Sequence, residues 1–183
     1  MRIAVLGSGR MGAALGLRFA GAGHRMTFTY SRDPRKLAAL ARRAGPRARA
    51  TAPGAAVHDA DVVVLAVHWR QVPRALRFAG PLSGKTLIDV TNPMTPTDDA
   101  LAVGHRISGG ELVARRARGA RVVKAFNTVP AELLRAGPAV LPERPAVCYC
   151  GDDRRAKRLV GRLIRQIGFD AVDCGGLAMR LTR

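Results

Sequence analysis

Short apolar runs alternate with longer stretches of helical periodicity from one end of the chain to the other. The run at residues 62–67, Val-Val-Val-Leu-Ala-Val, is apolar at every position, which is typical of a strand buried on both faces of a parallel sheet. This alternation predicts a doubly wound, mostly parallel α/β sheet in three layers. The expected strands are residues 2–6, 25–30, 61–67, 85–90, 121–125, 145–150 and 169–174.

Helices are expected where an apolar repeat or a capping signal follows a strand. Met11, Leu15 and Phe19 recur every four residues, so a helix should follow the first strand and end near residues 21–23. Three further helix starts carry a capping signal. Asp33 before Pro34 should start a helix that runs to about residue 43, and Ser108 with Glu111, in capping-box spacing, should start one that runs to about residue 118. Asp152 or Asp153 should start a third helix, whose apolar face is formed by Ala156, Leu159, Val160, Leu163 and Ile167.

The first strand is followed by a glycine-rich loop that can hold a diphosphate. Residues 7–12 read Gly7-Ser8-Gly9-Arg10-Met11-Gly12, a GxGxxG pattern between a strand and an amphipathic helix. In a Rossmann dinucleotide-binding fold, these glycines allow the tight turn, the approach of the pyrophosphate and close helix packing. The pyrophosphate then rests on the helix N-terminus. The alternative is an ordinary glycine-rich turn.

The end of the second strand favours NADP(H) over NAD(H). An enzyme that uses NAD places an acid there, about 20 residues after the loop, to bind the ribose hydroxyls. Here Ser31 and Arg32 occupy that place, and Lys36 lies one helical turn further on. Arginine binds phosphate through two parallel bonds, which suits a 2′-phosphate. Asp33 suits a helix cap better than a ribose ligand, and the alternative for Arg32 is a solvated loop arginine.

Three further strand ends should converge near the nicotinamide, because ligands lie beyond the carboxyl ends of parallel strands. His68 is a candidate acid or base, with a bond to a loop carbonyl as the alternative. Trp69 either stacks on a flat ring or begins the core of the next helix. Asn92 and Asn127 either bind a ligand or brace the backbone, and Lys124 is either structural or a ligand contact. The candidate cofactor-binding residues at these ends are Ala66, Val67, His68, Trp69, Asn92, Pro93, Ala125 and Asn127.

Length, charge and cysteines narrow the class of protein. The 183 residues and 48% hydrophobic composition fit one domain, 1–183, that ends in a short strand-helix extension. No apolar run reaches the length of a signal peptide or a membrane span, so we expect a cytoplasmic protein without membrane contact. Cys148, Cys150 and Cys174 form no CxxC pair, so we expect buried thiols on strands and no metal site.

A net charge of +18 favours anionic partners. Only Lys36, Lys85, Lys124 and Lys157 of the 31 basic residues are lysines, a bias that genome composition also explains. Nucleic acid is disfavoured, because aromatic residues make up only 4% and the arginines are scattered. We therefore expect the positive field to attract phosphorylated small molecules.

Taken together, these segments resemble the NADPH-dependent reductases of the deazaflavin coenzyme F420. The resemblance implies hydride transfer between nicotinamide C4 and deazaflavin C5, NADP(H) and F420 as cofactors, and a homodimer. It also implies that Ser31 and Arg32 hold the 2′-phosphate and that Ser8, Arg10 and Val72 line the NADP side. The residues that carry the resemblance are 7–12, 31–34, 63–69, 84–85, 88–89, 91–93, 122–128, 151–153, 156–157 and 168–169, of which Thr91-Asn92-Pro93 with Lys124-Ala125-Phe126-Asn127-Thr128 is the most specific combination.

The sequence departs from this family at two places. His68 stands where relatives have proline, and relatives continue past the segment 173–177 into helices that close the deazaflavin site and the dimer, whereas this sequence ends at Arg183. Two functions therefore stay open. The first is an oxidoreductase that uses NADPH with a deazaflavin, or with a flavin as in the similar cytosolic domain of the STEAP metalloreductases. The second is an NADP-binding sensor or accessory module without catalysis.

Overall fold

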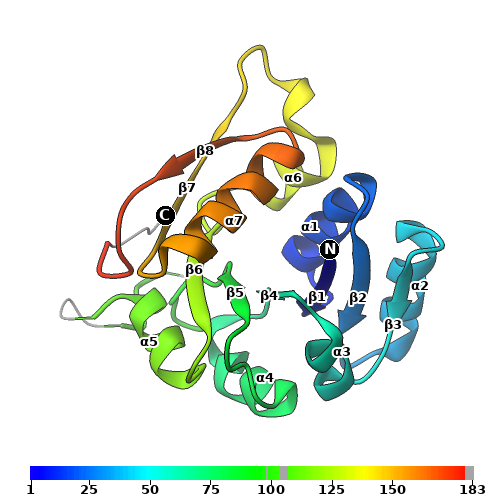
Figure 1. Ribbon diagram of the computed structural model, residues 1–183, viewed down its shortest axis with the longest axis horizontal. Helices are drawn as coiled ribbons and strands as arrows, with labels where there is room; N and C mark the ends of the chain where they lie inside the picture. The colour runs from blue at the N-terminus through cyan, green and yellow to red at the C-terminus, as the bar shows by residue number, and fades with distance from the viewer. Residues whose placement is uncertain (98, 104–106, 180–183) are drawn as a thin grey trace.

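One sheet runs through the molecule, and its strand order matches the predicted fold. The computed structural model describes residues 1–97, 99–103 and 107–179 (Figure 1). The strands lie in the order β3-β2-β1-β4-β5-β6-β7-β8, and every neighbouring pair is parallel except β6 and β7. The expected mostly parallel α/β fold is thereby confirmed. The strands are β1 (Arg2–Leu6), β2 (Arg25–Thr29), β3 (Ala48–Ala50), β4 (Val62–Leu65), β5 (Thr86–Asp89), β6 (Arg121–Ala125), β7 (Ala146–Gly151) and β8 (Asp170–Asp173).

Helices cover both faces of the sheet and give three layers. One core cluster packs Leu15, Leu37, Leu134 and Val160 against one face, and a second packs Val57, Leu76 and Val113 against the other. Figure 1 shows the helices on the two sides of the sheet. The α-helices are α1 (Arg10–Gly21), α2 (Pro34–Ala44), α3 (Pro53–Asp59), α4 (Val72–Ala79), α5 (Gly109–Arg116), α6 (Ala131–Ala136) and α7 (Arg154–Gln166), with 3₁₀ turns η1 (Trp69–Gln71) and η2 (Pro138–Val140).

The predicted capping residues begin their helices as expected. Asp33 accepts a hydrogen bond from the Arg35 N–H at 2.9 Å. Ser108 and Glu111 form a complete capping box at the start of α5, and Asp153, not Asp152, caps α7. These signals are local in sequence, because a side-chain oxygen two or three residues upstream satisfies a free N–H of the first turn.

Other elements differ from the prediction. The strand β3 was not predicted, because its three residues, Ala-Arg-Ala, lack a β-branched or aromatic side chain. The strand of the expected C-terminal extension is β8. Residues 174–179 are irregular with a turn near residues 176–179 and form no helix, and residues 180–183 lie outside the described part. Cys150 is buried on β7 as expected, whereas Cys148 is only half-buried. Placing Cys174 on a strand was wrong, because β8 ends at Asp173 and Cys174 lies half-buried in the following turn.

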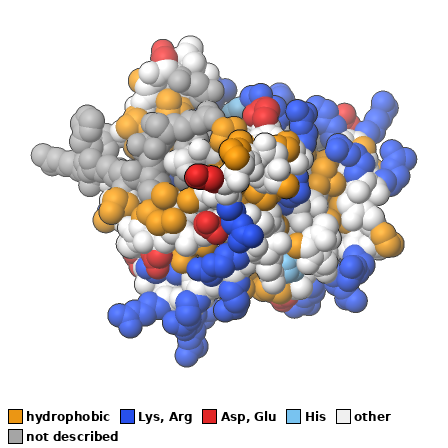
Figure 2. All heavy atoms as spheres, turned by 90° about the horizontal axis from the view of Figure 1, so that it is seen from above, with side chains coloured by type: hydrophobic (Ala, Val, Ile, Leu, Met, Phe, Trp, Pro, Cys, Tyr) orange, Lys and Arg blue, Asp and Glu red, His pale blue; other side chains and the backbone are white. Residues whose placement is uncertain are grey.

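Basic side chains are spread over the face of the molecule that Figure 2 shows. In Figure 2, Lys and Arg side chains lie at several separate places on the face shown, with apolar surface between them. Within the described ranges, no helix has the length and apolarity that a membrane crossing requires. Among these same residues, no three His, Cys, Asp or Glu side chains lie together in a group that could hold a metal ion.

Candidate functional site

The glycine loop lies at the point where the strand order reverses. From β1 the chain builds β2 and β3 on one side and then returns to place β4 on the other. Gly7 follows β1 with φ +117°, and a Cβ there would lie 2.3 Å from the Ala66 carbonyl oxygen. A Cβ on Gly12 would lie 2.1 Å from the Gly7 carbonyl oxygen. Both glycines are therefore required for the loop to pack against β4 and α1.

Gly9 differs from these two glycines because it faces open space. No heavy atom lies within 4 Å of a Cβ built at Gly9. Gly9 is the N-cap of α1, and no side chain caps this end of the helix or places an acid in its first turn. The first-turn N–H groups and the helix dipole thus form a site suited to an anion. Ser8 beside it is half-buried, and Met11 is half-buried on the core side.

Arg10 extends from this loop toward a neighbouring helix. Its guanidinium lies 3.3 Å from the Glu132 carboxylate at the start of α6, and the Arg10 side chain is 88% exposed. An exposed pair of this kind contributes little to stability. Arg10 therefore stands at the rim of the loop with most of its donors directed to solvent.

The end of β2 presents the two residues expected to bind the 2′-phosphate. Arg32 is exposed, and Ser31 is half-buried with its hydroxyl accepting a hydrogen bond from the Asp33 N–H at 3.1 Å. Asp33 is engaged as the cap of α2, as expected, and Lys36 is exposed on the first turn of that helix. Because the nearest acid is committed to the helix, the side chains that face outward here are cationic.

Tyr30 sets the direction of this segment. It has φ +60°, a left-handed conformation that is uncommon for a side chain of this size. Its ring centre lies 6.2 Å from that of Phe78, and the Arg74 guanidinium lies 5.5 Å from the Phe78 ring centre. The packed rings hold the turn that leads into Ser31 and Arg32.

The segment that follows β4 combines an exposed polar residue, His68, with buried apolar residues. His68 is exposed at the N-cap of η1, and its side chain makes no capping hydrogen bond there. Trp69 begins η1, is half-buried and packs against the core, which fits its core interpretation more than a free stacking surface. Val67 is half-buried, whereas Ala66 and Val72 are buried. Val72 offers its side chain to the core and not to an open surface.

A buried ion pair joins the ends of β5 and β6. The Lys124 ammonium donates to the Asp89 carboxylate at 3.0 Å and to the Thr91 carbonyl at 2.6 Å. The other Asp89 oxygen accepts from the Thr91 N–H and hydroxyl at 2.9 and 2.7 Å. The side chains of Lys124 and Asp89 are 3% and 0% exposed. Lys124 is therefore structural, the first of the two expected interpretations.

The two asparagines brace each other across the same pair of strand ends. Asn92 donates its amide to the Asn127 carbonyl at 3.0 Å, and Asn127 donates its amide to the Asn92 side-chain oxygen at 3.2 Å. Pro93 is buried, and a Cβ on Gly109 would meet its ring at 3.0 Å. Ala125 is fully buried at the end of β6. This edge is thus a rigid wall whose side chains are used internally.

The chemistry available at this edge is binding and orientation. Burial raises the pKa of the Cys150 thiol, next to Lys124 in the sheet register, to about 11, so it is protonated at neutral pH. His58 forms its hydrogen bond with Asp59, away from the glycine loop. Among the residues that the structure describes, no serine or cysteine forms a hydrogen bond with a histidine that could activate it as a nucleophile. The site therefore suits a reaction in which bound molecules supply the reactive groups.

Comparison with known proteins fits this geometry. The profile of the family described as NADP oxidoreductase, coenzyme F420-dependent, matches residues 2–93, which include the glycine loop, Arg32 and Asn92. The chain belongs to this family. The match ends before β6, so Lys124 and Asn127 lie outside the matched range. They are joined to it through Asp89 and Asn92.

The similarity of this family member to several known proteins extends over nearly all of its chain. A solved structure of a hypothetical protein from Sinorhizobium meliloti is 33% identical, with a TM-score of 0.87, and the match covers 97% of this chain and 86% of that one. A candidate F420-dependent NADP reductase from Arthrobacter sp. FB24 is 30% identical, with a TM-score of 0.86 and the same coverage. Metalloreductase STEAP3 of Rattus norvegicus is 33% identical over 177 residues, which are 97% of this chain and 34% of STEAP3. The chain thus spans about a third of the length of that curated relative.

The pairing of Asp89, the turn at Tyr30 and the contact between Arg10 and Glu132 were not predicted from the sequence. Asp89 ends an apolar strand, and a buried acid needs a partner of opposite charge. Its pairing with Lys124, in the next apolar strand, could therefore have been predicted from the sequence. The left-handed turn at Tyr30 could not, because tyrosine does not favour that conformation. The contact of Arg10 with Glu132 joins residues far apart in sequence and follows from the fold alone.

Proposed function

We propose that this chain binds NADP(H) at the glycine loop and transfers hydride between it and a deazaflavin, coenzyme F420, or a flavin. The observation that carries the proposal is the uncapped, acid-free start of α1 beside Gly9. The family and the named F420-dependent relative support the choice of cofactor and partner. The similarity to STEAP3 is the reason to test flavins beside F420.

The residues around the loop fit an adenosine phosphate and a diphosphate. The N–H groups at the start of α1 would bind the diphosphate over Gly9, where there is room for it. Arg32 and Lys36 are exposed and would bind the 2′-phosphate, with the Ser31 hydroxyl as a further donor. An acid in place of Ser31 or Arg32 would repel that phosphate. The residues present therefore select for NADP(H) and against NAD(H).

The opposite wall would orient the rings that exchange hydride. When bound, the nicotinamide supplies or accepts the hydride, and the protein's task is to hold the two rings in contact. The Asp89–Lys124 pair and the Asn92–Asn127 bonds fix the ends of β5 and β6, so that wall keeps its position. His68 and Trp69 stand at the edge between the loop and this wall. In this proposal His68 contacts the second ring and Trp69 supports it.

The direct test mixes purified protein with NADPH and oxidised F420, with FMN and FAD in parallel, and follows the absorbance of each compound. We expect one NADPH to be oxidised for each F420 or flavin reduced, and no reaction when the protein is omitted. NADPH binding without oxidation by any of the three acceptors would contradict hydride transfer. That outcome would instead establish the second function, an NADP-binding module.

A further inference from the structure

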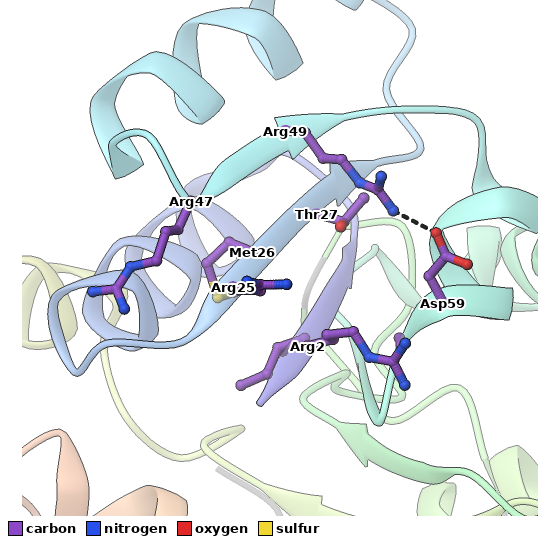
Figure 3. Close-up of a pocket in the computed structure, with 9 residues that line it drawn as sticks. Arg2, Arg25, Met26, Thr27, Arg47, Arg49 and Asp59 are labelled. Atoms are coloured by element: carbon purple, nitrogen blue, oxygen red, sulfur yellow. Dashed lines mark hydrogen bonds and ion pairs between the residues drawn. The ribbon is translucent and has the colours of Figure 1, made fainter.

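An arginine-lined hollow lies at the amino ends of the first three strands, on the α3 face of the sheet. Its volume is about 340 Å³. Thr27 and Ala60 form part of its lining, and Figure 3 shows Arg25 between Arg47 on one side and the Arg49–Asp59 pair on the other. The lining residues are Arg2, Ile3, Arg25, Met26, Thr27, Arg47, Arg49, Asp59 and Ala60.

Sheet register explains why arginines gather here. Arg2 pairs with Arg25 across β1 and β2, and Thr27 pairs with Arg49 across β2 and β3. Because side chains alternate along a strand, Arg25 and Thr27 lie on the same face of the sheet. Arg2, Arg25 and Arg49 thus come from three neighbouring strands of the sheet, and Arg47 lies in the turn directly before β3.

Two of the four guanidinium groups are already oriented by carboxylates. Arg2 donates to Asp61 at 3.2 and 2.7 Å through its Nε and Nη2. Arg49 forms an ion pair with Asp59. The hydrogen bond from Arg2 lowers the pKa of Asp61, and hydrogen bonds from His58 and then Arg49 lower the pKa of Asp59, so both acids are ionised at neutral pH.

The other two guanidinium groups, of Arg25 and Arg47, have no carboxylate within ion-pair distance among residues 1–97, 99–103 and 107–179. Arg25 and Arg47 thus share one hollow whose lining acid, Asp59, is paired with Arg49, and their like charges repel each other. An anion between them would remove this repulsion, and Arg2 and Arg49 keep further N–H donors that their acids do not use.

The proposed nucleotide site does not account for this cluster. The glycine loop follows the carboxyl end of β1, whereas Arg2 and Arg25 are the first residues of β1 and β2. Ligands of open α/β sheets bind beyond the carboxyl ends of the strands, so NADP(H) needs nothing at this edge. A volume of about 340 Å³ is at the lower end of the range for small-molecule sites.

We propose that this hollow is a second anion site that binds a compact polyphosphate-bearing molecule, separate from the proposed NADP(H) site. Arginine forks match phosphate oxygens, and several adjoining phosphate groups would reach more of the guanidiniums than one phosphate does. Asp59, which lines the hollow, and Asp61, which pairs with Arg2, disfavour an extended nucleic-acid backbone and favour a short ligand that fits between Arg25 and Arg47.

The test uses inorganic tripolyphosphate as the probe and protein saturated with NADPH, so that the glycine loop is blocked. Isothermal titration calorimetry should detect one tripolyphosphate per chain, bound more tightly than orthophosphate. Arg25→Ala with Arg47→Ala should weaken tripolyphosphate binding about tenfold or more, because two charge-assisted contacts are lost. NADPH affinity should stay unchanged in this double variant.

The matched control replaces two exposed arginines of α7, with Arg158→Ala and Arg162→Ala. This variant loses the same charge, and we expect it to bind tripolyphosphate as the wild type does. An equal loss in both double variants would overturn the site in favour of diffuse attraction by net charge. Binding of a single-stranded DNA oligonucleotide that needs Arg25 and Arg47, without tripolyphosphate binding, would overturn it in favour of a nucleic-acid surface. Unfolding midpoints of both variants show that the fold is intact.

Discussion

The two halves of the carboxyl edge are built in opposite ways. In the half at β1 and β2, the open half, glycines leave the backbone accessible and cationic side chains face outward: the space around Gly9 is empty and Arg32 is exposed. In the half at β5 and β6, the buried half, the polar side chains are buried and hydrogen-bonded to each other, as Asp89 and Lys124 show. The open half can bind an anion because its N–H donors and cations have few partners within the protein. The buried half keeps a fixed shape because its polar groups are hydrogen-bonded to each other, which suits a wall that orients a ligand.

The largest effect should come from breaking the buried half. Lys124→Met leaves the Asp89 carboxylate buried without its counter-charge, so the free energy of unfolding should fall by about 3 to 5 kcal/mol. Denaturant titration measures this loss. Adding Asp89→Leu should recover much of it, because no buried charge then remains. A loss below about 1 kcal/mol in the single variant would show that the pair is not what fixes this wall.

Gly7 and Gly9 separate folding from binding within the open half. Gly7→Ala should lower the free energy of unfolding by roughly 2 to 4 kcal/mol, since its φ of +117° and its 2.3 Å approach to the Ala66 oxygen both oppose a Cβ. Gly9→Ala, its matched control, should cost less, about 0.5 to 1 kcal/mol, because Gly9 has an ordinary φ of −71° and open space, so that only the weak N-cap preference of alanine opposes the change. Gly9→Ala should nevertheless weaken NADPH binding in a calorimetric titration. Unchanged NADPH affinity would place the diphosphate elsewhere.

Arg32 tests the cofactor choice of the open half. Arg32→Ala should weaken NADPH binding by about 1 to 3 kcal/mol, the scale of a lost charge-assisted hydrogen bond, and leave NADH binding nearly unchanged. Arg35→Ala removes an equally exposed charge three residues away and should change neither affinity. Equal weakening of NADPH and NADH by Arg32→Ala would mean that this arginine acts on the fold and not on the 2′-phosphate.

Ser108 gives the smallest of these effects, at the border of the buried half. Its hydroxyl accepts from the Glu111 N–H at 3.0 Å and donates to the Leu177 carbonyl at 2.6 Å, which ties α5 to the C-terminal segment. Ser108→Ala should therefore lower the free energy of unfolding by about 1 to 2 kcal/mol. NADPH affinity should not change. If it fell together with stability, the wall and the glycine loop would be coupled.

The same contrast explains how far the sequence alone reaches. The glycine loop, the Asp33 cap and the Ser108 capping box are each readable because their residues interact within a few positions. The bonds between Asn92 and Asn127, or Asp89 and Lys124, join residues 35 positions apart and follow from the register of β5 with β6. Sequence patterns name such residues as polar candidates. They do not say whether each one faces a ligand or another side chain.

We propose that the open half selects NADP(H) through the N-terminus of α1 and the Ser31-Arg32 pair. Calorimetric titration of the wild type with NADPH and then NADH, at one salt concentration, tests it most directly. We predict one NADPH per chain, bound at least about tenfold more tightly than NADH. Equal affinities, or no binding of NADPH at all, would contradict the account.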